Sequence, residues 1–346
     1  MLDERNPNIQ YVEPLLTILN GYGDATHPRT RMELRHLRYF VAVAEARHIT
    51  RAAERLGIQQ PPLSQQIKAL EAELGFELFR RHPKGVELTA GGRAYLPEAR
   101  TILASVDNAA AKAARAAKGL HGSISVGVTS SAAAHPLIPQ IIRAYREAYP
   151  EVNIDLSDGN AAQLTEEVDD GRLHAAFLRA PVARPSKLLF HHLLNEEMLL
   201  ILPIGHSLTG TKSSVGTPRI ALKSIASEPL VLVRRPGAPG LYANLLRACQ
   251  HAGFVPKIAA EVQHMLLNIS FVAAGVGVSV VPASLRGILH DKVVYCRILG
   301  AKPVLVAPIT LVCRADEESP TARNFIRLAI QPEQDRDEAR RSRARR

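Results

Sequence analysis

The sequence has few cysteines and no long hydrophobic run, and both absences narrow the class of protein. The three cysteines, Cys249, Cys296 and Cys313, are widely spaced, so they form neither a CxxC metal pair nor an even-numbered disulfide framework. No apolar run approaches the roughly 20 residues of a membrane-spanning helix. Residues 1–31 also lack the basic-then-apolar order of a secretory signal. We therefore expect reduced thiols, no metal site, no membrane partner and a cytoplasmic protein.

The motifs of common enzyme classes are missing as well. The pair Ser130-Ser131 does not lie inside a GxSxG elbow, and no His and acid can be placed beside it, which argues against a hydrolase. The side chains of His191 and His192 would point to opposite sides of a strand, which argues against both binding the same metal ion. Gly275 and Gly277 lack the third glycine of a dinucleotide loop and favour a helix-to-strand turn. We expect no enzyme activity and no cofactor.

What the sequence contains is enough material for two or three domains. Its 346 residues are 46% hydrophobic and 22% charged, as in folded soluble proteins, which argues against disorder and fibrous repeats. The net charge of +10 suggests a polyanionic partner, although net charge affects association with partners and does not indicate the fold. We predict a flexible extension at 1–31, unless the chain truly starts at Met32, and a charged, disordered tail at 333–346.

Residues 34–74 carry a helical hydrophobic period in three short segments. Thr50 is expected to cap the second helix, and Gly57 to end it in the left-handed conformation that a tight turn needs. The pair Pro61-Pro62 suits the first turn of the third helix, where a missing N–H costs little. A small residue at Ala53, four positions before the glycine, completes a spacing that is typical of a helix-turn-helix.

The third helix has a polar face that could read DNA, because amides and hydroxyls pair with base edges and lysine reaches phosphate. This face carries Gln60, Ser64, Gln65 and Lys68. Residues 77–81 and 86–89 are predicted as two strands of a β wing around a turn at 83–85, which presents Arg80 and Arg81 to the DNA backbone. Periodicity alone leaves open a small helical bundle whose polar face is merely solvated.

Residues 90–118 predict one long helix that begins after a Thr89 cap and ends at Gly119. Eight of the fourteen residues from Ala104 to Ala117 are alanine, the best helix former. Such a helix would be about 40 Å long and suits a linker. Small alanine faces also favour dimerisation through it, and a single solvated connector is the alternative.

The second half of the chain alternates predicted strands and helices, which is typical of an α/β domain. Polar side chains follow the first three strands: Thr129, Ser130 and Ser131, then Asn160, then Arg179. The carboxyl ends of strands are where open α/β sheets bind ligands, and hydroxyls at a helix N-terminus favour an anion. We predict a carboxylate or phosphate site there, with helix caps and a surface arginine as the alternative.

The segment MELRHLRYFVAVAEARHITRAAERLGIQQPPLSQQIKALEAELGFELFRRHPKGVELTAGG resembles the LysR-type transcriptional regulators, and so does VAAGVGVSVVP near the end. The likeness covers Met32 to Ile330. It implies a winged helix-turn-helix at 32–92, a linker and dimerisation helix at 93–119 and a two-lobed α/β effector domain, like a periplasmic binding protein, at 120–332. One lobe would take 120–194 with 299–332 and the other 195–298. Crossover strands near 194–203 and 293–299 would join them.

The resemblance also implies which residues bind. Those that would read the operator by resemblance are Gln60, Pro62, Ser64, Gln65 and Lys68. We also expect DNA contacts from Thr50, Arg51, Arg80 and Arg81. Within the family, GVTSSAAAHPLIP, SDGNAAQL and AAFLRAP resemble the branch that responds to aromatic acids and their ring-cleavage products, such as muconate. The residues that would hold the effector are Thr129, Ser130, Ser131, Asn160, Arg179, Arg235, Pro236 and Met265.

The resemblance therefore implies a sequence-specific transcriptional regulator whose operator binding or bending is controlled by a small carboxylate. Its partners would be a double-stranded DNA operator, a small organic acid, further copies of the chain in a dimer or tetramer, and RNA polymerase. A competing hypothesis is a cytoplasmic small-molecule-binding protein or enzyme whose N-terminal helices serve only dimerisation. The helix-turn-helix spacing, the polar helix face and the wing argue against that hypothesis.

Overall fold

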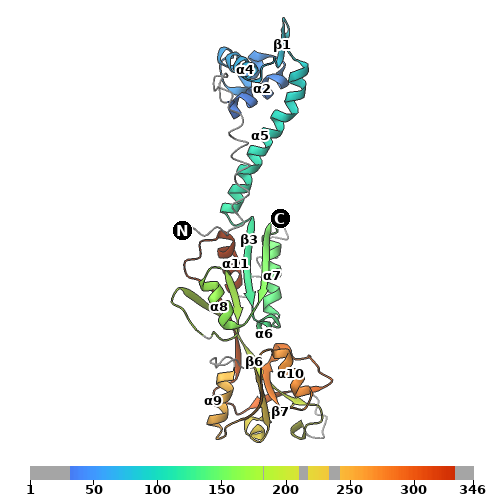
Figure 1. Cartoon of the computed structure of the whole chain (residues 1–346), viewed down its shortest axis with the longest axis vertical. Coiled ribbons are helices and arrows are strands. Elements are labelled where there is room, and N and C mark those ends of the chain that lie inside the picture. Colours follow the sequence, from blue (N-terminus) through green and yellow to red (C-terminus); the bar gives the residue numbers. More distant parts are fainter. Residues whose placement is uncertain (1–31, 182, 210–216, 234–241, 332–346) are drawn as a thin grey trace, which may run out of the picture. The chain divides into compact units, whose positions relative to one another are not determined.

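The computed structural model describes residues 32–181, 183–209, 217–233 and 242–331 (Figure 1). These residues form two compact units, which divide between Ala111 and Lys112. The predicted extension at 1–31 and the predicted tail at 333–346 lie outside the described residues. Within the described ranges, no helix is long and apolar enough to cross a membrane.

The first unit consists of three short helices, a two-stranded hairpin and the beginning of a long helix. Its core is formed by the inner faces of the three helices, with Phe40, Leu63 and Leu70 fully buried. The hairpin joins this core through Phe79, whose ring centroid lies 5.4 Å from that of Phe40. The elements are α2 (Leu34–Ala46), α3 (Ile49–Leu56), α4 (Gln60–Leu74), β1 (Phe79–His82), β2 (Gly85–Leu88) and α5 (Ala90–Ala117).

The turn between α3 and α4 forms as its spacing predicts. Ala53 is buried where the helices pack. Gly57 ends α3 with a φ of 66°, a left-handed conformation that glycine adopts without steric cost. The N–H of Ile58 donates to the Ala53 carbonyl at 3.0 Å. The pair Pro61-Pro62 lies in the first turn of α4, so the predicted helix-turn-helix is confirmed.

The predicted cap of α3 by Thr50 is wrong. The helix begins at Ile49, and His48, in an extended conformation, is its N-cap residue without a capping side-chain hydrogen bond. Because the His48 carbonyl already accepts from the N–H of Ala52 at 3.0 Å, Thr50 lies inside the first turn. The predicted cap of α5 is confirmed, since Thr89 Oγ1 accepts from the N–H of Gly92 at 2.9 Å.

The wing is an antiparallel hairpin in which Phe79 pairs with Leu88 and His82 with Gly85. Both strands differ from the predicted ranges, because β1 begins only at Phe79 and β2 already begins at Gly85. The turn is therefore confined to Pro83 and Lys84. A register with Arg80 opposite Glu87 follows from this shorter turn.

The second unit has two lobes with separate hydrophobic cores. Lobe I contains β3 (Gly122–Val128), β4 (Val152–Asp158), β5 (Ala175–Leu178), the first part of β6 (Leu188–Pro203), β12 (Val306–Arg314), α6 (Ser130–Ala133), α7 (Leu137–Ala148), α8 (Ala161–Asp169) and α11 (Pro320–Ile330). Lobe II contains the rest of β6, β7 (Arg219–Ala221), β8 (Pro229–Val233), β9 (Lys257–Val262), β10 (Ser279–Pro282), β11 (Val293–Leu299), α9 (Ala243–His251) and α10 (Met265–Ala273). This is the predicted two-lobed α/β fold.

One sheet runs through both lobes in the order β4-β3-β5-β12-β6-β11-β7, and β10 also pairs with β6. In lobe I, β3 is parallel to β4 and β5, whereas β12 is antiparallel to β5. The strands β8 and β9 form a separate parallel pair in lobe II. Because β3, β4 and β5 are parallel, their carboxyl ends meet at one edge of lobe I.

Two long strands connect the lobes, and only the first lies where it was predicted. In β6, residues up to Glu197 pair with β12, and residues from Met198 onward pair with β10. The predicted second crossover at 293–299 is wrong, because β11 pairs only with β7 and with the lobe II part of β6. The chain returns instead through β12, whose pairing with β6 shifts register between Ile309 and Thr310. Apolar strands with nonlocal partners are difficult to tell apart from sequence.

The three cysteines are free, buried thiols. Burial raises the pKa of Cys249, Cys296 and Cys313 to about 11. At pH 8 only about one thiol in a thousand is then ionised, and the thiolate is the reactive form. We expect a disulfide reagent such as DTNB to modify the native protein at least about 100-fold more slowly than protein denatured in guanidinium chloride. Rapid modification of one thiol in the native protein would contradict this.

Candidate nucleic-acid interface and effector site

The polar face of α4 forms as predicted. Gln60 is the first residue of the helix, and Ser64 and Lys68 follow at intervals of four, so the three lie on one face. Gln60, Gln65 and Lys68 are exposed, and Ser64 is half-buried. Amide and hydroxyl groups on this face can pair with base edges, and the lysine can reach a phosphate.

The other predicted DNA contacts surround this helix. Thr50 and Arg51 are exposed in the first turn of α3, and Pro62 is exposed in the first turn of α4. Arg80 and Arg81 are both exposed on β1, but successive strand residues point to opposite faces. The two wing arginines therefore occupy different environments.

The strand ends of lobe I bring Thr129, Asn160 and Arg179 to one edge of the sheet, as predicted. Thr129 follows β3, and its N–H donates to the carbonyl of Phe177 at 3.0 Å. The Thr129 hydroxyl oxygen is buried and has no hydrogen-bond partner among the described residues. A buried hydroxyl without a partner is costly, so it is available to a ligand.

Arg179 is buried at the end of β5 with 4% of its surface exposed, so the alternative of a surface arginine is wrong. Its Nε and Nη2 donate to the Ser131 carbonyl at 3.1 and 2.7 Å, and Nη2 also donates to Ser284 Oγ at 3.2 Å. Its Nη1 lies 2.6 Å from Glu196 Oε2. Desolvation lowers the pKa of Arg179, and the Glu196 carboxylate opposes that shift.

The groups around Arg179 come from both lobes. Ser131 belongs to α6 of lobe I, and Ser284 belongs to the 3₁₀ turn Ala283–Leu285 of lobe II. Glu196 lies on β6 next to the crossing and accepts a hydrogen bond from the N–H of Ser284. We call Arg179, Glu196, Ser131 and Ser284 the interlobe cluster. It links the lobes because Ser284 of lobe II bonds to both members of the buried ion pair of lobe I.

Among the described residues, no hydrogen bond joins Asn160 or Met265 to this cluster. Asn160 caps α8, because its Oδ1 accepts from the N–H groups of Ala162 and Gln163, both at 3.0 Å. The helix-cap alternative therefore holds for Asn160. Ser130 is exposed, and Met265 is buried at the start of α10. The predicted residues Arg235 and Pro236 lie outside the described residues.

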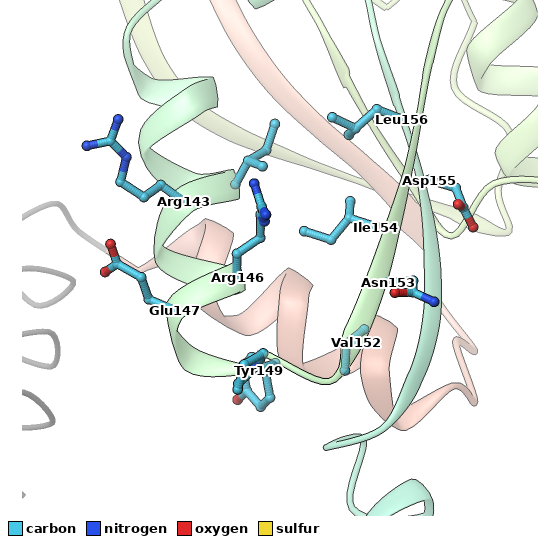
Figure 2. Close-up of a pocket in the computed structure, with 11 residues that line it drawn as sticks. Arg143, Arg146, Glu147, Tyr149, Val152, Asn153, Ile154, Asp155 and Leu156 are labelled. Carbon is cyan, nitrogen blue, oxygen red and sulfur yellow. The ribbon is translucent and has the colours of Figure 1, made fainter.

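A separate groove of about 720 Å³ lies on lobe I between α7 and β4 (Figure 2). Figure 2 shows Ile154 and Leu156 on the side of β4 that faces α7, with Arg143 and Arg146 projecting from the helix. None of the residues predicted to bind the effector lines this groove. The groove is therefore distinct from the strand-end site.

Sequence reasoning missed Glu196 and Ser284. A signal for Glu196 exists, because two carboxylates, Glu196 and Glu197, occur within the largely apolar segment Leu188–Pro203. Alternation along a strand buries one of them, and a buried carboxylate needs a cationic partner. Ser284 had no comparable signal, since it is 105 residues from Arg179 along the chain. Only the fold brings the two together.

A winged helix-turn-helix in one unit and a two-lobed α/β domain in the other define a ligand-responsive DNA-binding regulator. Family models agree: "Bacterial regulatory helix-turn-helix protein, lysR family" matches residues 34–93, and "LysR substrate binding domain" matches residues 117–331. The chain therefore belongs to the LysR family of transcriptional regulators.

Individual relatives span most of the chain. The regulator BudR of Raoultella terrigena is 37% identical over 297 residues, which cover 86% of this chain and all of BudR. BenM of Acinetobacter baylyi is 34% identical over 83% of this chain and 92% of BenM. The crystal structure of CbnR superimposes on this chain with a TM-score of 0.74. The superposition covers 86% of this chain and all of the CbnR chain, at 30% sequence identity. CbnR has also been solved in complex with its target DNA.

These relatives decide between the two functional hypotheses. They are transcriptional regulators, and the match includes the helix-turn-helix together with the effector domain. The protein is accordingly a DNA-binding regulator and not an enzyme. The hypothesis that its N-terminal helices serve only dimerisation is wrong, and so is the bundle with a merely solvated face.

Proposed function

We propose that the protein reads its operator with α4 and contacts DNA phosphates with its wing and with Lys68. Gln60, Ser64 and Gln65 are the base readers in this proposal. The support is their position on the second helix of a helix-turn-helix, which is the element that enters the major groove. Gln60 and Ser64 are four residues apart on one face, and Gln65 is exposed next to Ser64. Pro62, Thr50 and Arg51 would contact DNA beside them, and Arg80 and Arg81 would contact the backbone.

The effector is a small carboxylate that binds at the strand ends of lobe I, next to lobe II. The observation that carries this is Arg179, a buried guanidinium already paired with the Glu196 carboxylate at the end of β5. The hydroxyl of Thr129 supplies an unused hydrogen-bond donor at the same edge. An aromatic acid or its ring-cleavage product is the effector class, because the strand-end segments resemble that branch of the family.

Control follows from a population shift. The protein, as a dimer of dimers, holds and bends its operator, and a carboxylate that binds one lobe arrangement better than the other shifts the equilibrium towards it. The changed bend alters promoter access and contact with RNA polymerase in the cytoplasm. The size of the shift is set by the difference between the ligand's binding free energies for the two lobe arrangements.

Footprinting on the intergenic DNA upstream of the protein's own gene tests both halves of this function. Three kinds of sample are compared at low and at moderate salt: one without any acid, one with cis,cis-muconate and one with benzoate. We expect a specific footprint that one of the acids changes, with an affinity that falls steeply with salt because phosphate contacts release counterions. Binding without sequence preference would overturn operator recognition, and a footprint indifferent to both acids would overturn the effector class.

Replacing Thr129 with valine tests the strand-end site. The change removes the hydroxyl while keeping the shape, so we expect affinity for the active acid to fall about tenfold. Stability should be unchanged or slightly higher, because an unpartnered buried polar atom is lost. Isothermal titration calorimetry and thermal unfolding measure the two effects.

The matched control is Thr165→Val. Thr165 is also buried in lobe I, but its hydroxyl donates to the Ala161 carbonyl within α8 at 2.6 Å. We expect this variant to lose stability without losing effector affinity. Equal affinity losses in both variants would remove Thr129 from the site.

A further inference from the structure

The wing is fixed against the recognition helix through β1. Glu71, in the last turns of α4, accepts two hydrogen bonds on Oε1, from the N–H of Leu78 at 2.9 Å and from the N–H of Phe79 at 3.1 Å. A charged acceptor makes such bonds stronger than neutral ones. The start of β1 is therefore held by the same helix that carries the base readers.

A second attachment holds β2. The N–H of Val86 donates at 3.0 Å to the carbonyl of Arg47, the residue that ends α2. Gly85 makes this approach possible, because a Cβ built there would overlap with the same carbonyl oxygen. Hydrogen bonds to the helices thus anchor the backbone of both strands of the hairpin.

The strand alternation directs the two wing arginines differently. Arg81 shares a face of β1 with Phe79, which is buried in the core, and lies opposite the buried Val86. Arg80 lies on the other face, directly opposite Glu87. Arg81 is therefore turned towards the helices, and its Nη2 donates to Ser64 Oγ at 3.1 Å.

This contact changes what the Ser64 hydroxyl can do. A serine hydroxyl has one hydrogen to donate and two lone pairs that accept, whereas arginine is only a donor. Arg81 therefore takes a lone pair and leaves the hydroxyl hydrogen free. An exposed pair of this kind contributes little stability because its side chains lose entropy, but the anchored hairpin holds the Arg81 backbone on the face that is turned towards Ser64.

We propose that Arg81 is a positioning residue for Ser64: it fixes the hydroxyl as a hydrogen-bond donor towards an acceptor on a DNA base edge. Acceptors of this kind in the major groove are guanine O6 and N7, adenine N7 and thymine O4. Arg81 thus influences the sequence preference at one base pair per half-site without touching the base. The proposal rests on the proposed reading of the operator by α4.

The test is selection of bound sequences from a duplex library with a randomised core, using the full-length protein. The variants are Ser64→Ala, Arg81→Met, the double variant, Gln65→Ala and the matched control Arg80→Met. Ser64→Ala should reduce the preference at one base pair about fivefold. Arg81→Met should reduce it at the same base pair, and the double variant should lose no more than Ser64→Ala. Thermal unfolding checks that each variant folds.

Arg80→Met should weaken binding to all sequences alike and reduce the salt dependence, as expected for a phosphate contact. The inference is overturned if Arg81→Met only weakens binding to all sequences alike and leaves the preference unchanged at the base pair where Ser64→Ala reduces it. It is also overturned if Ser64→Ala changes no preference while Gln65→Ala changes one. If neither Ser64→Ala nor Gln65→Ala alters any preference, base reading by α4 itself fails, and the proposed function fails with it.

Discussion

Replacing Glu196 with alanine is expected to destabilise the effector domain by about 3–5 kcal/mol. The change leaves the guanidinium of Arg179 buried without the carboxylate that lies 2.6 Å from it. The N–H of Ser284 loses its acceptor as well. The free energy of unfolding, measured in urea by circular dichroism, reports the loss.

The neighbouring residue on β6 gives a matched control. Glu197 pairs with Arg297 at 3.4 Å, and about half of each side chain is exposed to solvent. Exposed pairs contribute at most about 1 kcal/mol, so Glu197→Ala should have a small effect. If Glu196→Ala and Glu197→Ala lower the free energy of unfolding by the same amount, the buried pair of the interlobe cluster contributes no more to stability than an exposed pair.

A double variant separates stability from ligand binding. Arg179→Met combined with Glu196→Leu removes both charges and fills the space with apolar atoms, which often restores the stability that a broken buried pair loses. We expect this variant to be more stable than Glu196→Ala but less stable than the wild type, because the Ser284 N–H and the Ser131 carbonyl lose their partners. We expect it to bind no carboxylate. A double variant that still binds the active acid with wild-type affinity would show that Arg179 does not hold the effector.

Replacing Gly85 with alanine is expected to weaken DNA binding by at least about tenfold, a loss of about 1.4 kcal/mol or more in binding free energy. The new Cβ would overlap with the carbonyl oxygen of Arg47, and backbone cannot move aside as the end of a side chain can. Gly85 also has a φ of 137°, which other residues rarely adopt. The wing must therefore shift away from α2 and lose its alignment with α4. Fluorescence anisotropy with the footprinted operator measures the affinity.

Gly75→Ala is the control for Gly85→Ala. Gly75 ends α4 with a φ of 75°, and a Cβ there would meet nothing within 4 Å. The left-handed conformation costs alanine roughly 1–2 kcal/mol of stability, but the wing need not move. We expect DNA affinity within about twofold of the wild type, a free-energy change below about 0.5 kcal/mol. Equal losses of affinity in the two variants would show that backbone strain, and not wing placement, governs binding.

The local parts of this fold could be read from the sequence because their determinants are adjacent residues. Gly57 and the pair Pro61-Pro62 specify the turn of the helix-turn-helix by their own conformational limits. The cap at Thr89 is equally local. The cap at Thr50 was misplaced because hydroxyl residues near a helix start can lie in its first turn as well as ahead of it.

Most of the strand-end site was beyond sequence reasoning for a different reason. Thr129 and Arg179 each directly follow a strand, and this position correctly predicts that they lie at one edge of the sheet. The carboxyl ends of parallel strands meet at the same edge. The partners of Arg179 come from β6 and from the 3₁₀ turn Ala283–Leu285, and no local pattern links them to β5. Asn160 uses its side-chain oxygen to cap α8, and its contact with the effector stays a prediction.

The crossover through β6 and β12 has a mechanical consequence. The two strands form a narrow antiparallel ribbon between the lobes, with a register shift between Ile309 and Thr310. Two-stranded ribbons twist more than wide sheets, and a bulge bends its strand and increases the local twist. We therefore expect the two lobes to rotate relative to each other about this ribbon, with the rotation centred close to the register shift.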